Sequence, residues 1–379
     1  MSTPYVVGAA MIRMGRYPDS SYAALAAPAA SAAVKDAGIE LSQIDSVYAG
    51  HTFGGPLVAQ RVMKVMGLGH VPMLNIDNAC SSGASALRAA VEAIRAGSVE
   101  VALVIGVDKL SVFGGGTLPL PEPDVEVRQG LTMPAVYAMR ARRFLHEREA
   151  GIEDLAAVSV KNRGYGALNP YAQFRKAVTL EEVLASRPIA DPLTLLQCCP
   201  TGDGAAAVVV VSERVRKTLD ATAMRVRASE LHSGQFVAGT RDMLKPQISV
   251  DCALEAFESS GIDPQDLDMV ELHDAFSIAE LVYYEALGLC GPGESVSFLH
   301  RSEPGKVVVN PSGGLLSRGH PVGASGVAQV VEAYWQLCRP ERTGARQVPD
   351  ARLALTHVTG GGIAGLDHGA CAIHIFEAA

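Results

Sequence analysis

A cysteine lies at the predicted start of a helix. The segment 75–83 reads Asn-Ile-Asp-Asn-Ala-Cys-Ser-Ser-Gly, and the residues that follow it, 84–94, have a helix-forming composition. The unpaired N–H groups and the positive dipole end of a helix N-terminus favour a thiolate, which is the nucleophilic form of cysteine. Cys80 is therefore a candidate nucleophile, with a small buried thiol as the alternative interpretation of this segment alone.

Two histidines and a glycine run provide the other groups that acyl transfer requires. His273 follows a predicted strand, His320 precedes a predicted helix, and three glycines occupy 360–362 between the last two predicted strands. In acyl transfer a thiolate attacks a carbonyl carbon, an imidazole moves its proton, and backbone N–H groups stabilise the oxyanion. The combination favours acyl transfer, although each histidine by itself also fits a structural role, at a strand end or as a helix cap.

Two repeated sequence patterns predict that the chain consists of two related halves. The pattern Gly-Ile-acid-x-x-x-apolar-Asp-x-Val at 38–47 returns at 261–270, and the segment 80–85 is matched by 320–325, each ahead of an Ala-rich helical stretch. Each half reads as β-α-β-α-β-β, so we expect two mixed sheets with helices between and outside them. The two helices that follow the second pair of segments should then meet where the halves join.

An irregular segment interrupts the first half. Residues 111–192 have no counterpart of similar length in the second half, and long insertions of this kind are commonly lids or binding loops. The insertion carries several Lys and Arg side chains that could meet an anionic part of a substrate. We predict a first half formed by 1–110 and 193–240, an inserted loop domain at 111–192, and a second half at 241–379.

The composition argues against several classes of protein. The 379 residues carry a net charge of −8 with no Lys/Arg block, so nucleic-acid or anionic-membrane binding has little support. No apolar run approaches the ~18 residues of a membrane helix, and no secretory signal pattern opens the chain. The seven scattered cysteines predict free thiols in a reducing cytoplasm, and no spacing typical of metal ligands is present.

Taken together, the motifs resemble the thiolase superfamily, and within it the thiolases related to sterol carrier protein two. The resemblance covers nearly the whole chain. It rests on five short motifs, which are Asn-Ala-Cys-Ser-Ser-Gly around Cys80, Asn169-Pro-Tyr171, Cys199-Pro-Thr-Gly-Asp203-Gly204, His273-Asp-Ala-Phe276 and Gly319-His320-Pro321. It implies a five-layered α-β-α-β-α fold of two duplicated halves, a loop domain that covers coenzyme A, and a dimer or a dimer of dimers.

The resemblance also implies a role for each candidate residue. Cys80 would accept the acyl group as a covalent thioester, and His320 would activate it. His273, with His320 or an ordered water, would hold the thioester oxygen on which an enolate develops. The backbone N–H groups of Cys80 and Gly362 would form a second oxyanion hole for the acyl-enzyme. Coenzyme A would be a co-substrate, with no permanently bound cofactor and no metal.

The sequence departs from the family pattern at one functional group. Thiolases use a second cysteine as acid and base, either two residues before the glycine run or at the third position of the His-Asp-x-Phe motif. These positions hold Val358 and Ala275 here, so neither thiol is present. A base is still needed for the proton next to the thioester carbonyl. The candidates are His357, His273, or a water held by the two histidines of the motifs.

Three functions remain open from the sequence. The leading hypothesis is a thiolase-type acyltransferase that cleaves a 3-oxoacyl-coenzyme A with coenzyme A, or catalyses the reverse Claisen condensation. The second is a thiolase-fold retro-aldolase on a 3-hydroxyacyl-coenzyme A, with Tyr283 or Tyr284 as a base, although both tyrosines fit apolar helix packing equally well. The third is a scaffold subunit of an acyl-transfer complex. The family includes members with a small zinc-ribbon and OB-fold partner, and the resemblance makes such a partner plausible beside a homodimer.

Overall fold

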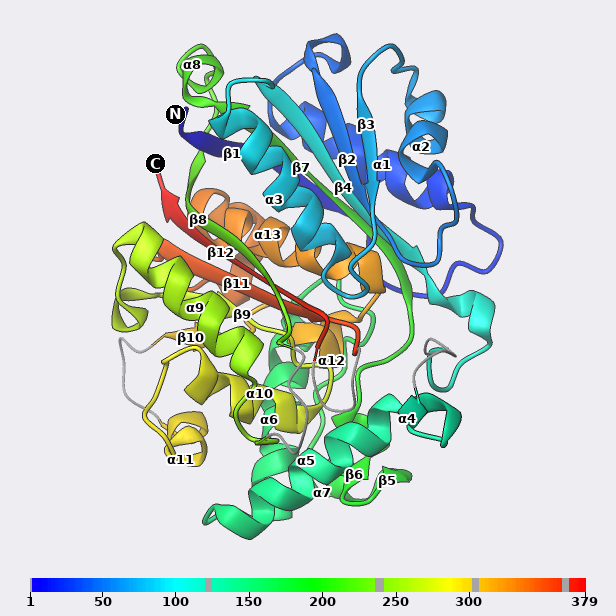
Figure 1. Cartoon of the computed structure of the whole chain (residues 1–379), viewed down its shortest axis with the longest axis vertical. Coiled ribbons are helices and arrows are strands. Elements are labelled where there is room, and N and C mark those ends of the chain that lie inside the picture. Colours follow the sequence, from blue (N-terminus) through cyan, green and yellow to red (C-terminus); the bar gives the residue numbers. More distant parts are fainter. Residues whose placement is uncertain (1, 120–124, 236–241, 302–306, 363–367) are drawn as a thin grey trace.

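The computed structural model describes residues 2–119, 125–235, 242–301, 307–362 and 368–379. In these ranges a ten-stranded sheet forms the centre of the molecule and divides into two halves (Figure 1). The first half consists, in order across the sheet, of β1 (Pro4–Met11), β7 (Asp203–Ser212), β4 (Val101–Lys109), β2 (Ser46–Gly50) and β3 (Met73–Ile76). The second half consists of β8 (Met224–Ser233), β12 (Ala370–Ala378), β11 (Leu353–Gly360), β9 (Met269–Glu271) and β10 (Val308–Val309).

The two halves of the sheet have the same strand order. The first strand of each half, β1 or β8, lies beside its last strand, β7 or β12, and the third strand of each half lies at the outer edge. The halves join where β1 pairs with β8 at two positions. This common order confirms the predicted duplication. The predicted boundary at residue 240 lies outside the described residues. Strand β8 lies before that boundary, but it pairs along most of its length with β12 and so belongs to the second half of the sheet.

Helices cover both faces of the sheet and separate its halves. The first half carries α1 (Tyr22–Asp36) and α2 (Val58–Met66) on its outer face, and the second carries α9 (Gln247–Ser260) and α10 (Ser277–Ala286) (Figure 1). Between the halves lie α3 (Ser82–Arg95) and α13 (Val322–Cys338). The arrangement confirms the predicted five layers in the order α-β-α-β-α.

The predicted internal repeat is present as the same turn in both halves. Gly38 after α1 and Gly261 after α9 both have a backbone φ of +67°, a conformation that favours glycine. A short 3₁₀ turn follows each glycine and leads into β2 or β9. The carboxylate of Asp45 then accepts hydrogen bonds from two backbone N–H groups at the entry to β4, and that of Asp268 does the same at the entry to β11.

The insertion forms a helical lobe beyond the ends of the central strands (Figure 1). It contains α4 (Val125–Arg128), α5 (Met133–Glu147), α6 (Ile152–Leu168), α7 (Leu180–Leu184) and the short strand β5 (Pro188–Ala190), which pairs with β6 (Leu193–Thr194) just after the insertion. α6 packs against α10 and against α12 (Gly314–Arg318) of the second half. The remaining short helices are α8 (Glu213–Arg216), α11 (Ser295–Leu299) and α14 (Pro340–Thr343).

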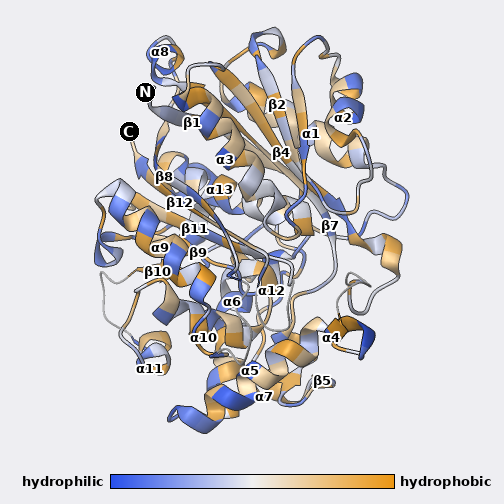
Figure 2. Ribbon diagram, in the orientation of Figure 1, coloured by the Kyte–Doolittle hydropathy of each residue, from blue (hydrophilic) through white to orange (hydrophobic). Residues whose placement is uncertain are grey.

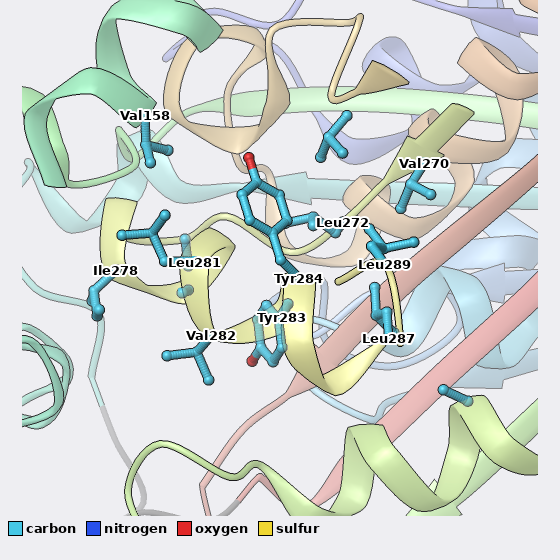
Figure 3. Packing of buried hydrophobic residues seen from close by; sticks show 14 of the residues in the cluster. Val158, Val270, Leu272, Ile278, Leu281, Val282, Tyr283, Tyr284, Leu287 and Leu289 are labelled. Carbon is cyan, nitrogen blue, oxygen red and sulfur yellow. The ribbon is translucent and has the colours of Figure 1, made fainter. Parts of the chain in front are cut away.

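The apolar residues lie where strands are covered on both faces. All residues of β4 and β7 are buried, and both strands are largely hydrophobic in Figure 2. Such continuous apolar runs are expected for strands between two helical layers. On α10, Tyr283 and Tyr284 lie among leucine and valine side chains, among them Leu281, Val282 and Leu287 (Figure 3). Among the described residues, no helix combines the length and the apolar character needed to cross a bilayer.

The two central helices touch each other through glycines. A Cβ atom on Gly83 would lie 2.5 Å from the carbonyl oxygen of Gly323, and one on Gly326 would lie 2.7 Å from the backbone nitrogen of Ala84. Larger residues would therefore push the backbones apart. The first turn of α13 is also tied to the first half of the chain, because the Gly323 N–H donates to the buried carboxylate of Asp108 at 2.7 Å. The contact confirms the predicted meeting of the two helices.

Replacing Gly83 by alanine is expected to lower the free energy of unfolding by about 1–3 kcal/mol, because the added methyl group would lie 2.5 Å from the Gly323 carbonyl oxygen and 3.0 Å from the stiff side chain of Val327. Gly164→Ala is the matched control. Gly164 lies inside α6 with no heavy atom within 4 Å of its would-be Cβ, so we expect alanine there to raise the stability. Chemical denaturation followed by circular dichroism measures both changes. Equal stability of Gly83→Ala and the unmodified protein would contradict the backbone contact.

Candidate active site

Cys80 and His320 are in direct contact although they are far apart in the sequence. The Cys80 Sγ lies 3.3 Å from Nε2 of His320, and the other ring nitrogen, Nδ1, lies 2.7 Å from the hydroxyl oxygen of Ser325. The Ser325 hydroxyl donates its hydrogen to the carbonyl oxygen of Pro321 at 3.1 Å, so its oxygen accepts from Nδ1–H. This leaves Nε2 without a hydrogen and facing the thiol, as a base for the Cys80 proton requires.

His273 completes a group of three reactive side chains. Its ring meets that of His320 edge-on, with 5.1 Å between ring centroids, and its Nδ1 is buried without a hydrogen-bond partner among the described residues. One side-chain donor atom from each of Cys80, His273 and His320 lies within 4.8 Å of the other two. By atom type the three could also hold a metal ion. Together with the glycine loop described below, they suit acyl transfer.

A strained turn presents the cysteine at the start of α3. Ala79 has a φ of +49°, which is uncommon for a residue with a side chain and costs conformational energy. The turn is stabilised by Asn78, whose backbone N–H donates to the hydroxyl of Ser82 and whose side-chain amide donates to that of Ser85, both at 2.9 Å. Because α3 begins at Ser82, the prediction that Cys80 precedes a helix N-terminus is confirmed.

Burial keeps both reacting groups uncharged. It raises the pKa of the Cys80 thiol to about 12, against the lowering effect of a hydrogen bond from the Gly361 backbone N–H. Burial and the nearby Arg318 guanidinium lower the pKa of His320 to about 3. The resting pair is therefore a thiol and a neutral imidazole. This differs from the thiolate expected from the helix start, because the loss of hydration outweighs the helix dipole.

The neutral pair makes a specific prediction for alkylation of Cys80. We expect the rate with iodoacetamide to rise about tenfold per pH unit from about pH 6 to pH 9 without a plateau, because only the small thiolate fraction reacts. Site-resolved mass spectrometry of the Cys80 peptide measures this rate. A thiolate–imidazolium pair would instead give a rate independent of pH across this range, and that outcome would overturn the assignment.

The glycine loop after β11 lies against the cysteine turn. A Cβ atom on Gly360 would lie 2.1 Å from the carbonyl oxygen of Asn78, so only glycine fits at the end of the strand. Two backbone N–H groups act on the Cys80 sulfur and lower its pKa, that of Gly361, one residue before the predicted donor Gly362, and that of Cys80 itself. The oxyanion role of Gly362 stays a prediction.

The two faces of β11 differ in their relation to the site. Val358, at one position of the missing acid–base cysteine, packs with Ala84 against Cys80. The neighbouring His357 lies on the other face of the strand, where its Nε2 lies 3.0 Å from the Ser249 hydroxyl on α9. The structure therefore brings His273 and His320 to the cysteine, but not the His357 side chain.

The other missing thiol position lies beside a different cysteine. The backbone carbonyl of Ala275 accepts a hydrogen bond from the backbone N–H of Cys199 at 2.8 Å. The Cys199 thiol is partly buried, and burial together with the neighbouring thiols of Cys198 and Cys80 raises its pKa well above the usual range. Cys199 therefore lies near the site. The sequence analysis named it only as part of a family motif and gave it no role in the site.

A buried carboxylate pair connects the two histidine motifs to the insertion. The side-chain amide of Asn162 on α6 donates to Asp274 at 2.7 Å and to Glu280 at 2.8 Å. Asp274 also accepts from the backbone N–H of Leu315 on α12 at 2.7 Å, and Lys161 forms an ion pair with Glu280 at 2.8 Å. Burial and the adjacent Glu280 carboxylate raise the pKa of Asp274 well above its usual range. The network holds the loop of His273, the helix before His320 and the insertion in one arrangement.

Several of these contacts were not foreseen from the sequence. Ser325 belongs to the segment that matches 80–85, and a serine five residues after the candidate base His320 is a usable signal for a hydrogen bond across a helix N-terminus. Gly361 was visible only as a member of a glycine run. Asn162 lies in the insertion, and no local pattern shows which distant carboxylates it would bridge.

Comparison with known proteins identifies the family to which the chain belongs. Thiolase, N-terminal domain, matches residues 4–214, and Thiolase C-terminal domain-like matches residues 229–368. Benzoylsuccinyl-CoA thiolase subunit BbsB of Thauera aromatica is 42% identical, covering 94% of each chain. Acetyl-CoA acetyltransferase of Methanothermobacter thermautotrophicus is 36% identical over 98% of each chain. Sterol carrier protein 2 of Oryctolagus cuniculus is 38% identical over 94% of this chain and 69% of its own.

A solved structure extends the similarity to the whole fold. It is described as Ltp2-ChsH2(DUF35) aldolase and matches with a TM-score of 0.85 at 25% identity, covering 100% of this chain and 98% of its own. The matches confirm the predicted resemblance and the prediction of a thiolase-type acyltransferase. With two family models and relatives that align over almost its full length, the chain belongs to the thiolase family.

Proposed function

We propose that this chain transfers acyl groups between coenzyme A thioesters through a covalent thioester on Cys80. In one direction it would cleave a 3-oxoacyl-coenzyme A with coenzyme A, and in the other it would join two acyl groups. The observation that carries this proposal is the 3.3 Å contact between Cys80 Sγ and the unprotonated Nε2 of His320. A nucleophile with its base already in hydrogen-bond range is the arrangement that covalent catalysis requires.

The cleavage reaction would proceed in two steps. Nε2 of His320 accepts the thiol proton while the sulfur attacks the 3-oxo carbonyl carbon, and the bond between C2 and C3 then breaks. The electron pair passes to the departing thioester as an enolate, which takes up a proton at C2, and the acyl group remains on Cys80. The thiol of a second coenzyme A attacks this thioester, returns its proton to the enzyme and releases the shortened acyl-coenzyme A.

His273 is the better supported candidate for the group that handles the proton at C2. It lies beside Cys80 and His320, and its buried Nδ1 has no partner among the described side chains. His357, the other candidate, faces α9 and is hydrogen-bonded there. For the acyl-enzyme we propose an oxyanion hole formed by backbone N–H groups of Cys80 and of the glycine loop, with Gly362 as the predicted donor.

We propose that the insertion at 111–192 covers coenzyme A. Its helix α6 packs on α10 and α12, which follow and precede the two histidine motifs, so the insertion lies next to the two segments that bring His273 and His320 to Cys80. Coenzyme A would be a co-substrate, and no permanently bound cofactor is needed for the steps above. The free thiols fit the reducing cytoplasm that we propose as the location.

Two protein partners are also proposed. The edge strand β3 and the adjacent α2 expose Leu74 and Val65, with exposed fractions of 44% and 64%, and an unpaired edge with apolar side chains fits a homodimer. A small zinc-ribbon and OB-fold subunit is the second partner. BbsB is named a subunit, and the Ltp2 structure is described with a DUF35 protein.

The retro-aldolase alternative has less structural support than acyl transfer. The hydroxyl of Tyr284 donates to the carboxylate of Glu280, and that of Tyr283 lies 3.1 Å from Thr359 and 3.3 Å from His368. Both hydroxyls are therefore buried and already paired, whereas a catalytic base needs access to substrate.

Intact-mass measurement tests the proposed function. Incubation with an acyl-coenzyme A should add the mass of one acyl group to the protein, and free coenzyme A should remove it. Turnover without any adduct would favour the retro-aldolase, and adduct formation only after a partner subunit is added would favour a complex.

A further inference from the structure

A histidine behind the glycine loop connects that loop to two tyrosines. Nδ1 of His368 lies 2.8 Å from the carbonyl oxygen of Gly361. Its Nε2 lies 3.3 Å from the hydroxyl of Tyr137 on α5 and 3.3 Å from that of Tyr283 on α10. His368 and both tyrosine rings are buried, and the two hydroxyls come from different parts of the chain. The group has no role in the steps proposed above.

The hydrogen-bond partners define which ring nitrogen carries the hydrogen. A carbonyl oxygen can only accept, so Nδ1 of His368 donates to Gly361 and Nε2 is left as an acceptor for a tyrosine hydroxyl. Burial and the Arg140 guanidinium lower the pKa of His368 to about 4, and His357 is the other titratable group that acts on this ring. The imidazole therefore stays neutral near pH 7, and the tautomer is preserved.

Gly361 is engaged through both its N–H group and its carbonyl oxygen. Its N–H lies against the Cys80 sulfur, while its carbonyl oxygen is held by His368. That carbonyl belongs to the peptide group whose N–H is contributed by Gly362, the predicted oxyanion donor. A hydrogen bond to the oxygen of a peptide polarises its N–H and fixes its direction. Gly361 has a φ of +62°, so the loop also relies on a conformation that a hydrogen bond helps to maintain.

We propose that His368 is a positioning residue that aims the N–H groups of the glycine loop at the acyl oxygen of the thioester on Cys80. The proposal rests on the proposed acyl transfer. Tyr137 belongs to the insertion and stacks on Phe276 of the His-Asp-x-Phe motif, with 4.3 Å between ring centroids. His368 is thus held partly by the insertion proposed to cover coenzyme A, so the order of that lobe and the order of the oxyanion hole are coupled.

Kinetics of three variants test this role. His368→Leu should lower the rate of Cys80 acylation by about 10- to 100-fold, because the N–H groups of the loop would no longer be aimed at the reacting oxygen. KM should stay within about twofold, because this interaction acts in the transition state and not in substrate binding. His368→Asn can still donate to Gly361 and should restore most of this rate. The double variant Tyr137→Phe with Tyr283→Phe keeps the ring contacts, removes the hydroxyls that hold Nε2, and should give a smaller loss. His300→Leu, on an exposed histidine paired with Asp154, is the control and should act like the unmodified protein.

Alkylation of Cys80 separates positioning from general damage. Its transition state has no oxyanion, so His368→Leu should slow iodoacetamide much less than it slows acylation. Equal loss in both reactions, or unchanged acylation in a folded His368→Leu protein, would overturn the proposal. If His368→Leu does not fold, the acylation and alkylation rates of the tyrosine double variant are compared in its place. Unchanged acylation in that variant would contradict the positioning role of His368. If the unmodified protein forms no acyl adduct, the proposed function fails and this inference fails with it.

Discussion

Cys80→Ala is expected to lower kcat for acyl transfer by at least about four orders of magnitude, because the covalent intermediate can no longer form and the remaining groups cannot replace it. The acyl adduct should also disappear from the intact-mass spectrum. Stability should change little, since the side chain is small and contacts Ala84 and Val358 without filling a large volume. Rates of 3-oxoacyl-coenzyme A loss with coenzyme A as second substrate measure the effect.

The matched control for this experiment is Cys338→Ala. Cys338 is also a partly buried free thiol, but it lies at the far end of α13, where its Sγ donates to the carbonyl oxygen of Ala223 at 3.4 Å. Its replacement should leave both turnover and adduct formation unchanged. Cys80→Ala protein that retains a substantial part of the turnover would refute a covalent mechanism and point to the retro-aldolase.

His320→Ala is expected to give the second largest loss, about 10²- to 10⁴-fold in kcat, because the Cys80 thiol loses the base that accepts its proton. Ser325→Ala should give a smaller loss in the same direction, since the imidazole remains but the hydrogen on Nδ1 loses its acceptor. Stopped reactions followed by intact mass should show slower acylation in both variants. His300→Ala is the control because its exposed ring lies outside the site.

The pH dependence of the unmodified protein adds an independent check on His320. The pKa of this imidazole is lowered to about 3, so its base form persists as the pH falls and is lost only near that value. The acid limb of kcat/KM should therefore lie well below pH 6.5, the usual region for histidine. An acid limb near pH 6.5 that disappears in His320→Ala would contradict a neutral, buried imidazole.

The duplicated fold could be read from the sequence because its signals are local. Gly38 and Gly261 end equivalent helices, and Asp45 and Asp268 each accept two backbone hydrogen bonds from the next strand. Turns of this kind depend on a few neighbouring residues, so the local sequence is enough to predict them. The motifs around Cys80 and the two histidines carried the rest of the family prediction.

Features that depend on tertiary surroundings could not be read in the same way. The face of β11 occupied by His357 is fixed by strand register, and a shift of one residue would have reversed it. The uncharged state of Cys80 follows from its burial, whereas the sequence shows only the helix start. The contacts of Asn162 and Tyr137 with the second half of the chain join segments more than a hundred residues apart.

The glycine contact between α3 and α13 has a consequence for how such enzymes can diverge. It sets the spacing of the sulfur and the His320 imidazole by the approach of two backbones, and no residue of the insertion takes part in it. Loops placed on a rigid scaffold can change while the scaffold keeps its geometry. Under the proposed role of 111–192 as the cover of the substrate, changes in this segment can alter the preferred acyl group while the thiol and its base keep their spacing.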